Sequence, residues 1–275
     1  MNLQQIEKLR VAAYRVNPTL RLRTMAAAAR YIDRVGFCWL FAPARHSLEL
    51  PSLFEAVKGR RNAHIEDWDS DSDKVWAWKS ELPAARRAYY GKAFVGKPVF
   101  ISLQMLPCAL AALGTDAEQF EELYEHGVIS YEAKKIFHAL DSLGAQPTMS
   151  LRAAASLDGK GDNNARYHRG LDELQRRMLV MPIGATNEGG SWPSQIFDLV
   201  ARWFPAHAAQ ARELDIGDAR RALITRYLKT VIAASPTTLM RLFGIARPEL
   251  DVLLQDLMAC KFIRFDGEWV TAKYT

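Results

Sequence analysis

The sequence predicts a mainly α-helical α+β protein built from tandem winged helix-turn-helix units. Two segments of the 275-residue chain each indicate three helices followed by a β-hairpin, and one segment can be laid on the other. A repeated supersecondary unit is much stronger evidence for a fold than either copy alone. The net charge of +5 is spread along the chain, which permits a polyanionic partner.

The first region, residues 1–115, is expected to be an α/β domain that resembles a winged helix. Apolar and aromatic residues at helical spacing predict helices over residues 2–15, 23–35, 50–59, 74–83 and 84–94. Short apolar runs predict strands over residues 36–42 and 97–102. Gly59 is expected to end its helix, because glycine adopts the left-handed conformation found after helix C-termini.

The second and third domains are expected over residues 116–205 and 206–275. In the second, the predicted elements are helices over 131–143, 148–157 and 162–178, then a hairpin over 179–200 with a glycine-rich tip. In the third, they are helices over 216–233, 235–244 and 247–261, then a hairpin over 262–274. Thr148 and Ser235 are expected to cap the middle helices, and Asp266-Gly267 to form the last turn.

The two copies align with a constant offset. Four residues of the second domain are matched 83 positions later: Leu171, Leu174, Val180 and Gly184 fall on Leu254, Leu257, Ile263 and Gly267. Before the third helix, Pro147 and Thr148 fall on Pro236 and Thr237, 89 positions later. The difference is roughly the length of the extra loop DGKGDN, so we interpret the loop as an insertion.

The helix over 162–178 is one candidate for contact with nucleic acid. With Leu171 at the centre of the buried face, three arginines lie opposite at about one-turn spacing, and asparagines and a lysine precede them. The residues of this candidate surface are Lys160, Asn163, Asn164, Arg166, Arg169 and Arg176. The alternative is an ordinary exposed helix, because Arg169 and Glu173 have the i,i+4 spacing of a surface ion pair.

A more basic candidate surface lies in the first region. The candidate contact residues of this surface are Arg21, Arg23, Arg30 and Arg34. If these arginines contact the phosphate backbone of duplex DNA, binding should weaken steeply with salt. The alternative for each arginine is a solvated surface position.

Few chemical motifs are present. The histidines and cysteines lack metal-ligand spacing, and no glycine-rich phosphate loop occurs, so we expect no metal and no cofactor. Cys38, Cys108 and Cys260 are far apart, which favours a reduced, cytoplasmic setting. No run of about 18 apolar residues indicates a membrane span.

Asp33 is the candidate catalytic carboxylate, because a carboxylate near arginines stays ionised and can act as a base or orient water. Four aromatic residues are candidates for stacking on an extruded base, namely Trp76, Trp78, Tyr89 and Tyr90. The alternative is that Asp33 pairs with Arg30 or Arg34 and that the aromatic residues fill a core.

The chain resembles a known group of proteins in two features. The repeated winged helices and the stretch ARYIDRVGFCWLF are similar to the AlkZ/YcaQ-like tandem winged-helix proteins, which include DNA glycosylases for crosslink and alkylpurine repair. LELPSLFEAVKG, VWAWKSELP and YYGKAFVGKPVFIS bring the chain nearest to the shorter AlkZ-related proteins. The resemblance implies a Gln-x-Gln or Gln-x-Asp pair for base excision; here Asp33 takes the acidic position and Tyr31 departs from the first Gln.

The sequence therefore predicts a protein that binds duplex DNA, including distorted or damaged DNA, with glycosylase-like base excision through Asp33 as a further hypothesis. The full-length enzymes of the group carry a C-terminal β-barrel, for which we expect no counterpart here. Two alternatives of other classes stay open. One is a transcriptional regulator that reads sequence with residues 162–178, and the other is a protein-interaction module.

Overall fold

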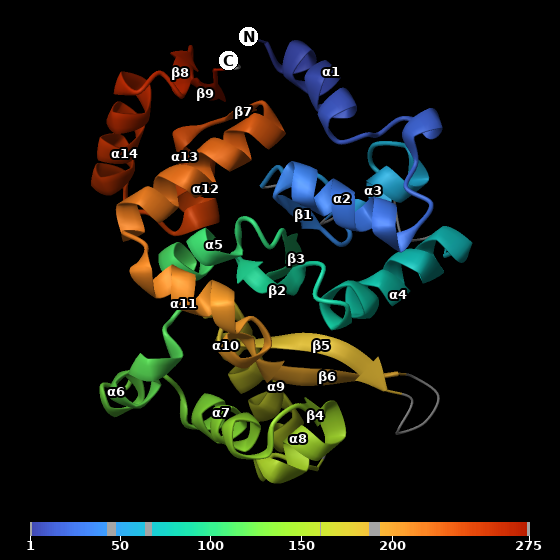
Figure 1. The fold of residues 1–275 in the computed structure, drawn as a ribbon, viewed down its shortest axis with the longest axis vertical. Coiled ribbons are helices and arrows are strands. Elements are labelled where there is room, and N and C mark those ends of the chain that lie inside the picture. The colour runs from blue at the N-terminus through green and yellow to red at the C-terminus, as the bar shows by residue number, and fades with distance from the viewer. Residues whose placement is uncertain (1, 43–47, 64–67, 160, 187–192, 274–275) are drawn as a thin grey trace.

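Three copies of one arrangement make up most of the molecule. The computed structural model describes residues 2–42, 48–63, 68–159, 161–186 and 193–273. Within these ranges the order helix, strand, helix, helix, strand, strand occurs three times. The second copy occupies the lower part of the molecule, and the first and third copies face each other above it (Figure 1). The predicted mainly α-helical α+β class is confirmed.

The elements of the three units correspond one to one. The first unit contains α2 (Met25–Val35), β1 (Phe37–Trp39), α3 (Leu53–Lys58), α4 (Ser70–Ala84), β2 (Tyr89–Phe94) and β3 (Lys97–Ile101). The second contains α7 (Tyr131–Leu143), β4 (Gln146–Pro147), α8 (Thr148–Ala154), α9 (Asp162–Arg176), β5 (Val180–Thr186) and β6 (Ser194–Leu199). The third contains α12 (Ile216–Val231), β7 (Ala233–Ala234), α13 (Pro236–Phe243), α14 (Arg247–Ala259), β8 (Ile263–Asp266) and β9 (Trp269–Ala272).

The remaining elements precede or connect these units. They are α1 (Leu3–Ala13), η1 (Pro18–Leu20), α5 (Leu106–Leu113), η2 (Ala117–Gln119), α6 (Phe120–Glu125), α10 (Val200–Trp203) and α11 (Pro205–Glu213). Helix α5, expected in the first domain, packs against α11 and α12. No helix in the part of the chain that the structure describes is long and apolar enough to cross a membrane.

Each unit has a three-stranded antiparallel sheet with its last strand in the centre. The strand orders are β1-β3-β2, β4-β6-β5 and β7-β9-β8. The first strand of each unit pairs with one side of the central strand, and the hairpin partner pairs with the other side. A short strand, two helices and a hairpin in this pairing have the connectivity of a winged helix.

The sheet of the first unit is buried on both faces. Tyr89 and Ile101 point into one core, whereas Tyr90 and Phe100 point into another, formed with α2, α3 and α4. Successive residues of a strand face opposite sides, so both sets are apolar here. The helix predicted over 84–94 is wrong, because a strand buried on both faces lacks the apolar–polar alternation that would identify it.

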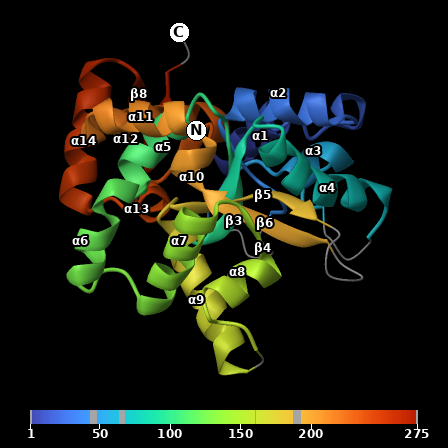
Figure 2. The same cartoon turned by 60° about the horizontal axis from the view of Figure 1, so that its bottom comes forward.

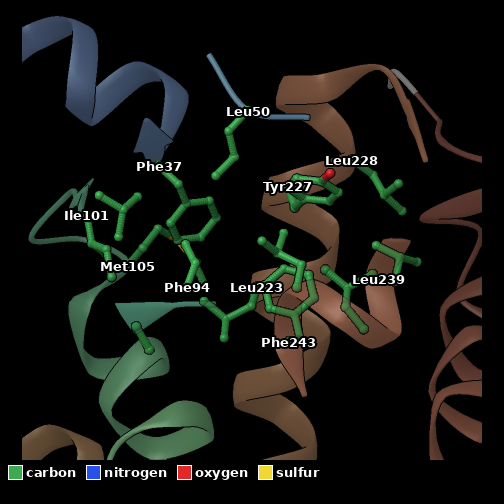
Figure 3. Packing of buried hydrophobic residues seen from close by; sticks show 14 of the residues in the cluster. Phe37, Leu50, Phe94, Ile101, Met105, Leu223, Tyr227, Leu228, Leu239 and Phe243 are labelled. Carbon is green, nitrogen blue, oxygen red and sulfur yellow. The ribbon is translucent and has the colours of Figure 1, made fainter. Parts of the chain in front are cut away.

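The first and third units share one hydrophobic core, to which β5 of the second unit adds Met181 and Ile183. Aromatic and aliphatic side chains from both sides interlock in it, with the rings of Phe94 and Phe243 5.8 Å apart and those of Tyr227 and Phe243 5.6 Å apart (Figure 3). Phe37 adds an edge contact to Phe94 at 5.4 Å. The two units are therefore packed as one body.

Helix α1 joins these two units through buried polar contacts. Arg10 Nε donates to the carbonyl of Val231 at 2.9 Å, and its Nη2 donates to that of Ala233 at 3.0 Å. Nearby, Arg61 pairs with Glu55, whose side chain is 1% exposed, at 2.9 Å. Burial of such groups is tolerated because each is hydrogen-bonded.

The helices of the second unit enclose a separate core. Phe120 stacks on Phe137 with ring centroids 3.8 Å apart, and Tyr167, Leu171 and Leu174 of α9 are buried beside them. The 83-residue offset is confirmed for the three aliphatic pairs but not for the glycines, because Gly184 lies within β5 whereas Gly267 lies in the turn between β8 and β9. Leu254 and Leu257 are buried in α14, and β5 and β8 begin at the matched residues Val180 and Ile263.

The predicted correspondence before the third helix is displaced by one residue. Ser235 caps α13 as predicted and accepts from Thr238 N at 3.2 Å, but the matching N-cap of α8 is Pro147, 88 positions earlier. Thr148 is not a cap. Its hydroxyl instead donates to the carbonyl of Gln195 at 2.9 Å, which ties α8 to β6.

Candidate nucleic-acid interface

Helix α2 carries the two predicted catalytic residues on different faces. Tyr31 is 2% exposed and packs in the core of the first unit, where its hydroxyl donates to the carbonyl of Tyr14 at 3.2 Å. Burial raises the pKa of Tyr31 well above its ordinary value. Asp33, two residues later, is exposed. Only Asp33 of this pair is therefore accessible to a partner.

Asp33 lies at the junction of the first and third units. Burial of part of its side chain raises the pKa of this carboxyl, and the charges of Arg87 and Arg226 oppose the rise. Arg226, from α12, also donates to the backbone carbonyl of Asp33. The expected pairing of Asp33 with Arg30 or Arg34 is thus wrong, because the guanidiniums nearest to it come from after α4 and from α12.

The end of α2 has room for Arg226 because residue 36 is glycine. Gly36 has a φ of +80°, and a Cβ placed there would lie 2.7 Å from Arg226 Nε. Two requirements, a left-handed conformation and close approach, are met by glycine alone. The guanidinium is therefore held against the helix end that carries Asp33.

Three of the four predicted stacking residues lie in the protein core. Trp78 and Tyr90 are each 6% exposed, and Tyr89 is fully buried. Trp76 is the exception at 40% exposed; Lys79 Nζ lies 3.3 Å from its ring centroid, and Trp68 packs edge-on at 5.9 Å. Burial lowers the pKa of Lys79 to about 8. Trp76 is thus the stacking candidate that solvent reaches.

The α9 arginine face is defined as Arg166, Arg169 and Arg176. Arg166 is paired within the molecule, whereas Arg169 and Arg176 are exposed and have no hydrogen bond or ion pair with a described residue. Arg166 Nε pairs with Glu132 Oε1 of α7 at 2.7 Å. This hydrogen bond, with a smaller effect from Arg169, lowers the pKa of Glu132. Arg176 lies over Gly96 in the β2–β3 turn, where a Cβ would come within 2.7 Å of its Nε.

The remaining candidates on α9 are also in local contacts. Asn163 Nδ2 donates to the carbonyl of Asp158 at 2.9 Å, Asn164 is half-buried, and Lys160 lies outside the described residues, as does the hairpin tip 187–192. The predicted Arg169–Glu173 pair does not form. Glu173 instead accepts from Ser130 N and Oγ, at 3.2 and 2.6 Å, and caps α7 from outside.

The equivalent helices of the other two units carry carboxylates near their starts. In α4, Asp69 pairs with Lys58, whose hydrogen bond is the main cause that lowers the pKa of Asp69 to about 2. In α14, Arg247 pairs with Asp251 at 2.8 Å, and Glu249 pairs with Arg220 of α12. Neither helix presents an uncompensated basic surface.

The arginines around α2 differ from one another in their contacts. Arg21 is held by the structure, because its Nε donates to the carbonyl of Val57 at 2.8 Å and it pairs with Asp71. Arg34 is exposed and donates to the carbonyl of Ala13 at 2.7 Å. Arg23 and Arg30 are exposed, and neither has a hydrogen bond or ion pair with another described residue.

We call Arg23, Arg30 and Arg34 the α2 basic surface. None of the three pairs with a carboxylate among the described residues. Figure 2 shows α2 along the upper edge of the molecule, where it can be reached from outside.

Sequence reasoning did not single out Arg226, because α12 reaches α2 only through tertiary packing and no local motif marks it.

Among the described residues, no three His, Cys, Asp or Glu side chains are grouped so that they could hold a metal ion. All three cysteines are free.

The molecule is thus an α+β protein of three units with the same order of elements and the same strand pairing, and an exposed basic helix lies in the first unit. The AlkZ-related family matches residues 22–244, and the chain belongs to this family. Among solved structures, the chain is similar to the Streptomyces sahachiroi DNA glycosylase AlkZ with a TM-score of 0.56 and 15% sequence identity, over 96% of this chain and 69% of that one. No curated protein matches the sequence.

Proposed function

We propose that this protein binds duplex DNA, damaged DNA included, with the α2 basic surface as its main contact to the phosphates. The observation that carries the proposal is that Arg23 and Arg30 are exposed without a partner among the described residues, on a member of the AlkZ-related family. Guanidiniums that are not neutralised internally are free to displace counterions from DNA. Such contacts position a protein on the duplex and carry no base sequence.

The α9 arginine face supplies at most a secondary contact in this proposal. Arg169 and Arg176 are exposed, but Arg166 would have to leave Glu132 to meet a phosphate. Sequence readout by this helix, as in a transcriptional regulator, would need the same arginines to face a groove. The fold therefore supports binding to the DNA backbone more strongly than reading of its sequence.

Base excision is the second proposed function, and the exposure of Asp33 favours it. A carboxylate between two guanidiniums can orient water or stabilise a cationic sugar. Excision also requires an extruded base to be held, and three of the four stacking candidates are buried, which leaves Trp76 alone in reach of solvent. Because fewer residues could hold a base than could contact phosphates, the geometry supports DNA binding more strongly than base excision.

The test is a gel-shift panel with intact, alkylated and crosslinked duplexes over a salt series, followed by heating in alkali to reveal abasic sites. We expect binding that weakens steeply with salt and that does not depend on base sequence. Selection of one defined site from random duplexes would support a regulator instead. Absence of binding at low ionic strength would support a protein-interaction module.

The Asp33→Asn variant separates the two proposed functions. We expect it to keep DNA binding and, where the wild type releases bases, to lose that release. The raised pKa of Asp33 means that the folded state disfavours the ionised carboxyl. The wild-type protein therefore loses stability as the pH rises through the pKa of Asp33. Because asparagine carries no charge, Asp33→Asn should have a free energy of unfolding at pH 7 no lower than that of the wild type. Base release at the wild-type rate would remove Asp33 from the reaction.

A further inference from the structure

A pocket lies between the end of α1 and the outer side of α2. Its volume is about 290 Å³, and it is lined by Arg15, Leu22, Ala27, Arg30, Tyr31 and Arg34. Three of these six side chains are guanidiniums and none is a carboxylate. The floor is apolar, with the ring of Tyr31 6.0 Å from the guanidinium carbon of Arg34.

The backbone after α1 places Arg15 at this pocket. Arg15 follows the last turn of α1 with a φ of +55°, a left-handed conformation that is costly for a residue with a side chain. The turn is held by Arg15 N donating to Ala12 O at 3.2 Å and by Val16 N donating to Val11 O at 3.0 Å. The chain thus reverses at Arg15 and directs this arginine toward α2.

Two of the three guanidiniums are fixed by carbonyl groups instead of carboxylates. Arg34 Nη2 donates to Ala13 O at 2.7 Å, and Arg15 Nε donates to Leu20 O at 3.4 Å. These bonds orient the side chains and leave their charges uncompensated. Arg30 has no such bond to any described residue. The pocket thus combines two oriented cations with a third that is free to move onto a ligand.

The charge of Arg34 is disfavoured by its surroundings in the pocket. Burial, and then the charge of Arg15, lower the pKa of the Arg34 guanidinium. Like charges raise the free energy of the charged state, and an anion bound between them would relieve the repulsion. Guanidinium forks match the oxygen geometry of phosphate by paired hydrogen bonds.

We infer that this pocket is an oxyanion site that binds a phosphate group between Arg15, Arg30 and Arg34. The phosphate could come from the DNA backbone or from a free phosphate compound, and the chemistry of recognition is the same for both. Assignment of the phosphate to DNA rests on the proposed function. The preference of the pocket for phosphate rests on its three arginines and does not depend on that function.

The first arm of the test uses inorganic phosphate alone. The arginine Nε–Hε signals in proton–nitrogen correlation spectra are followed while phosphate replaces chloride at constant ionic strength. We expect saturable shifts of the pocket arginines in the wild type and in Arg241→Gln, which removes an exposed guanidinium from α13 in the third unit. In Arg30→Gln the affinity for phosphate should fall at least fivefold, with no loss of fold, because Arg30 has no hydrogen bond or ion pair with a described residue to break.

Shifts that do not saturate, or that persist unchanged in Arg30→Gln, would overturn the inference. The second arm adds a short duplex to the phosphate-loaded protein. Displacement of phosphate by the duplex identifies the DNA backbone as the source, whereas binding without displacement assigns the pocket to a free phosphate compound. Saturable phosphate binding with no duplex binding would contradict the proposed function but would still support a phosphate site in this pocket.

Discussion

The α9 arginine face and the α2 basic surface carry the same number of arginines and differ in what surrounds them. On α9, Arg166 pairs with Glu132 and Arg176 lies over the β2–β3 turn. Arg23, just before α2, and Arg30, on α2, meet no carboxylate among the described residues. The charge of a helix therefore does not by itself decide its availability to DNA, because a carboxylate on a neighbouring element can occupy one of its arginines, as Glu132 occupies Arg166.

The positions of the two helices in their units explain the difference. Helix α9 is the third helix of the second unit and packs against both α7 and β2, where Lys92 pairs with Asp172. Helix α2 is the first helix of the first unit, and its arginines lie on the side away from the core. The contacts of α9 with α7 and β2 bring Glu132 to Arg166 and Lys92 to Asp172, so part of the charge of α9 is neutralised within the molecule.

The largest effect is expected from Gly170→Ala, which tests how firmly α9 is held on α7. A Cβ at residue 170 would lie 2.9 Å from the backbone nitrogen of Ala133 and 2.9 Å from the carbonyl carbon of Glu132. Alanine favours a helix over glycine by about 1 kcal/mol, but backbone atoms cannot yield as a side chain can. We expect a net loss of roughly 1–3 kcal/mol in the free energy of unfolding, measured by urea denaturation.

Gly184→Ala is the matched control for this variant. A Cβ at residue 184 would meet Ala84 Cβ at an ordinary 3.7 Å, so we expect a change within about 0.5 kcal/mol. Equal stability of Gly170→Ala and the wild type would mean that α9 can move away from α7 at little cost. The arginines of α9 would then again be candidates for contact with DNA.

The next effect compares two double variants in DNA affinity. Arg23→Gln with Arg30→Gln should weaken binding to a duplex about tenfold and lower the slope of log K against log salt by roughly 1–2, since each lost phosphate contact removes about 0.9. Arg166→Gln with Arg169→Gln should weaken binding less than about threefold, as expected for one secondary contact. Fluorescence anisotropy over a salt series measures both. The reverse order of effects would move the interface to α9.

The smallest effect is expected from Glu132→Gln, which removes the carboxylate that holds Arg166. The hydrogen bond from Arg166 lowers the pKa of Glu132. The pair therefore stabilises the fold above the ordinary carboxyl pKa, and that contribution is lost as the pH falls through the lowered value. At pH 7 the variant should lose less than about 1 kcal/mol, and its stability should converge with that of the wild type in acid.

The same variant frees Arg166 for a phosphate. We expect DNA affinity to rise about two- to threefold, as an added phosphate contact would produce at moderate salt, measured by anisotropy beside the wild type. Unchanged affinity together with a pH-independent stability difference would show that Glu132 and Arg166 are not coupled.

Much of the fold could be predicted from the sequence, because helical spacing and the repeat are local signals. The match of Leu171 with Leu254 placed both third helices correctly. The first unit was predicted less well, since Tyr89 and Tyr90 lie on a strand buried on both faces and give no alternating pattern. The site could be predicted only in part. The exposure of Arg30 could be predicted from its position on the polar face of its helix. The neighbours of Asp33 could not, because they depend on how α12 packs against α2.

The core shared by the first and third units has a consequence for how the chain opens. Removing residues after 205 would uncover Phe37 and Phe94 and leave Arg10 without its acceptors at Val231 and Ala233. Amide hydrogens of β3 and α12 should therefore exchange with solvent in one cooperative event, although more than a hundred residues separate them. The helices around Phe120 and Phe137 have their own core and should exchange in another. We therefore expect the three units to unfold as two cooperative blocks, the larger of which brings together segments from the two ends of the chain.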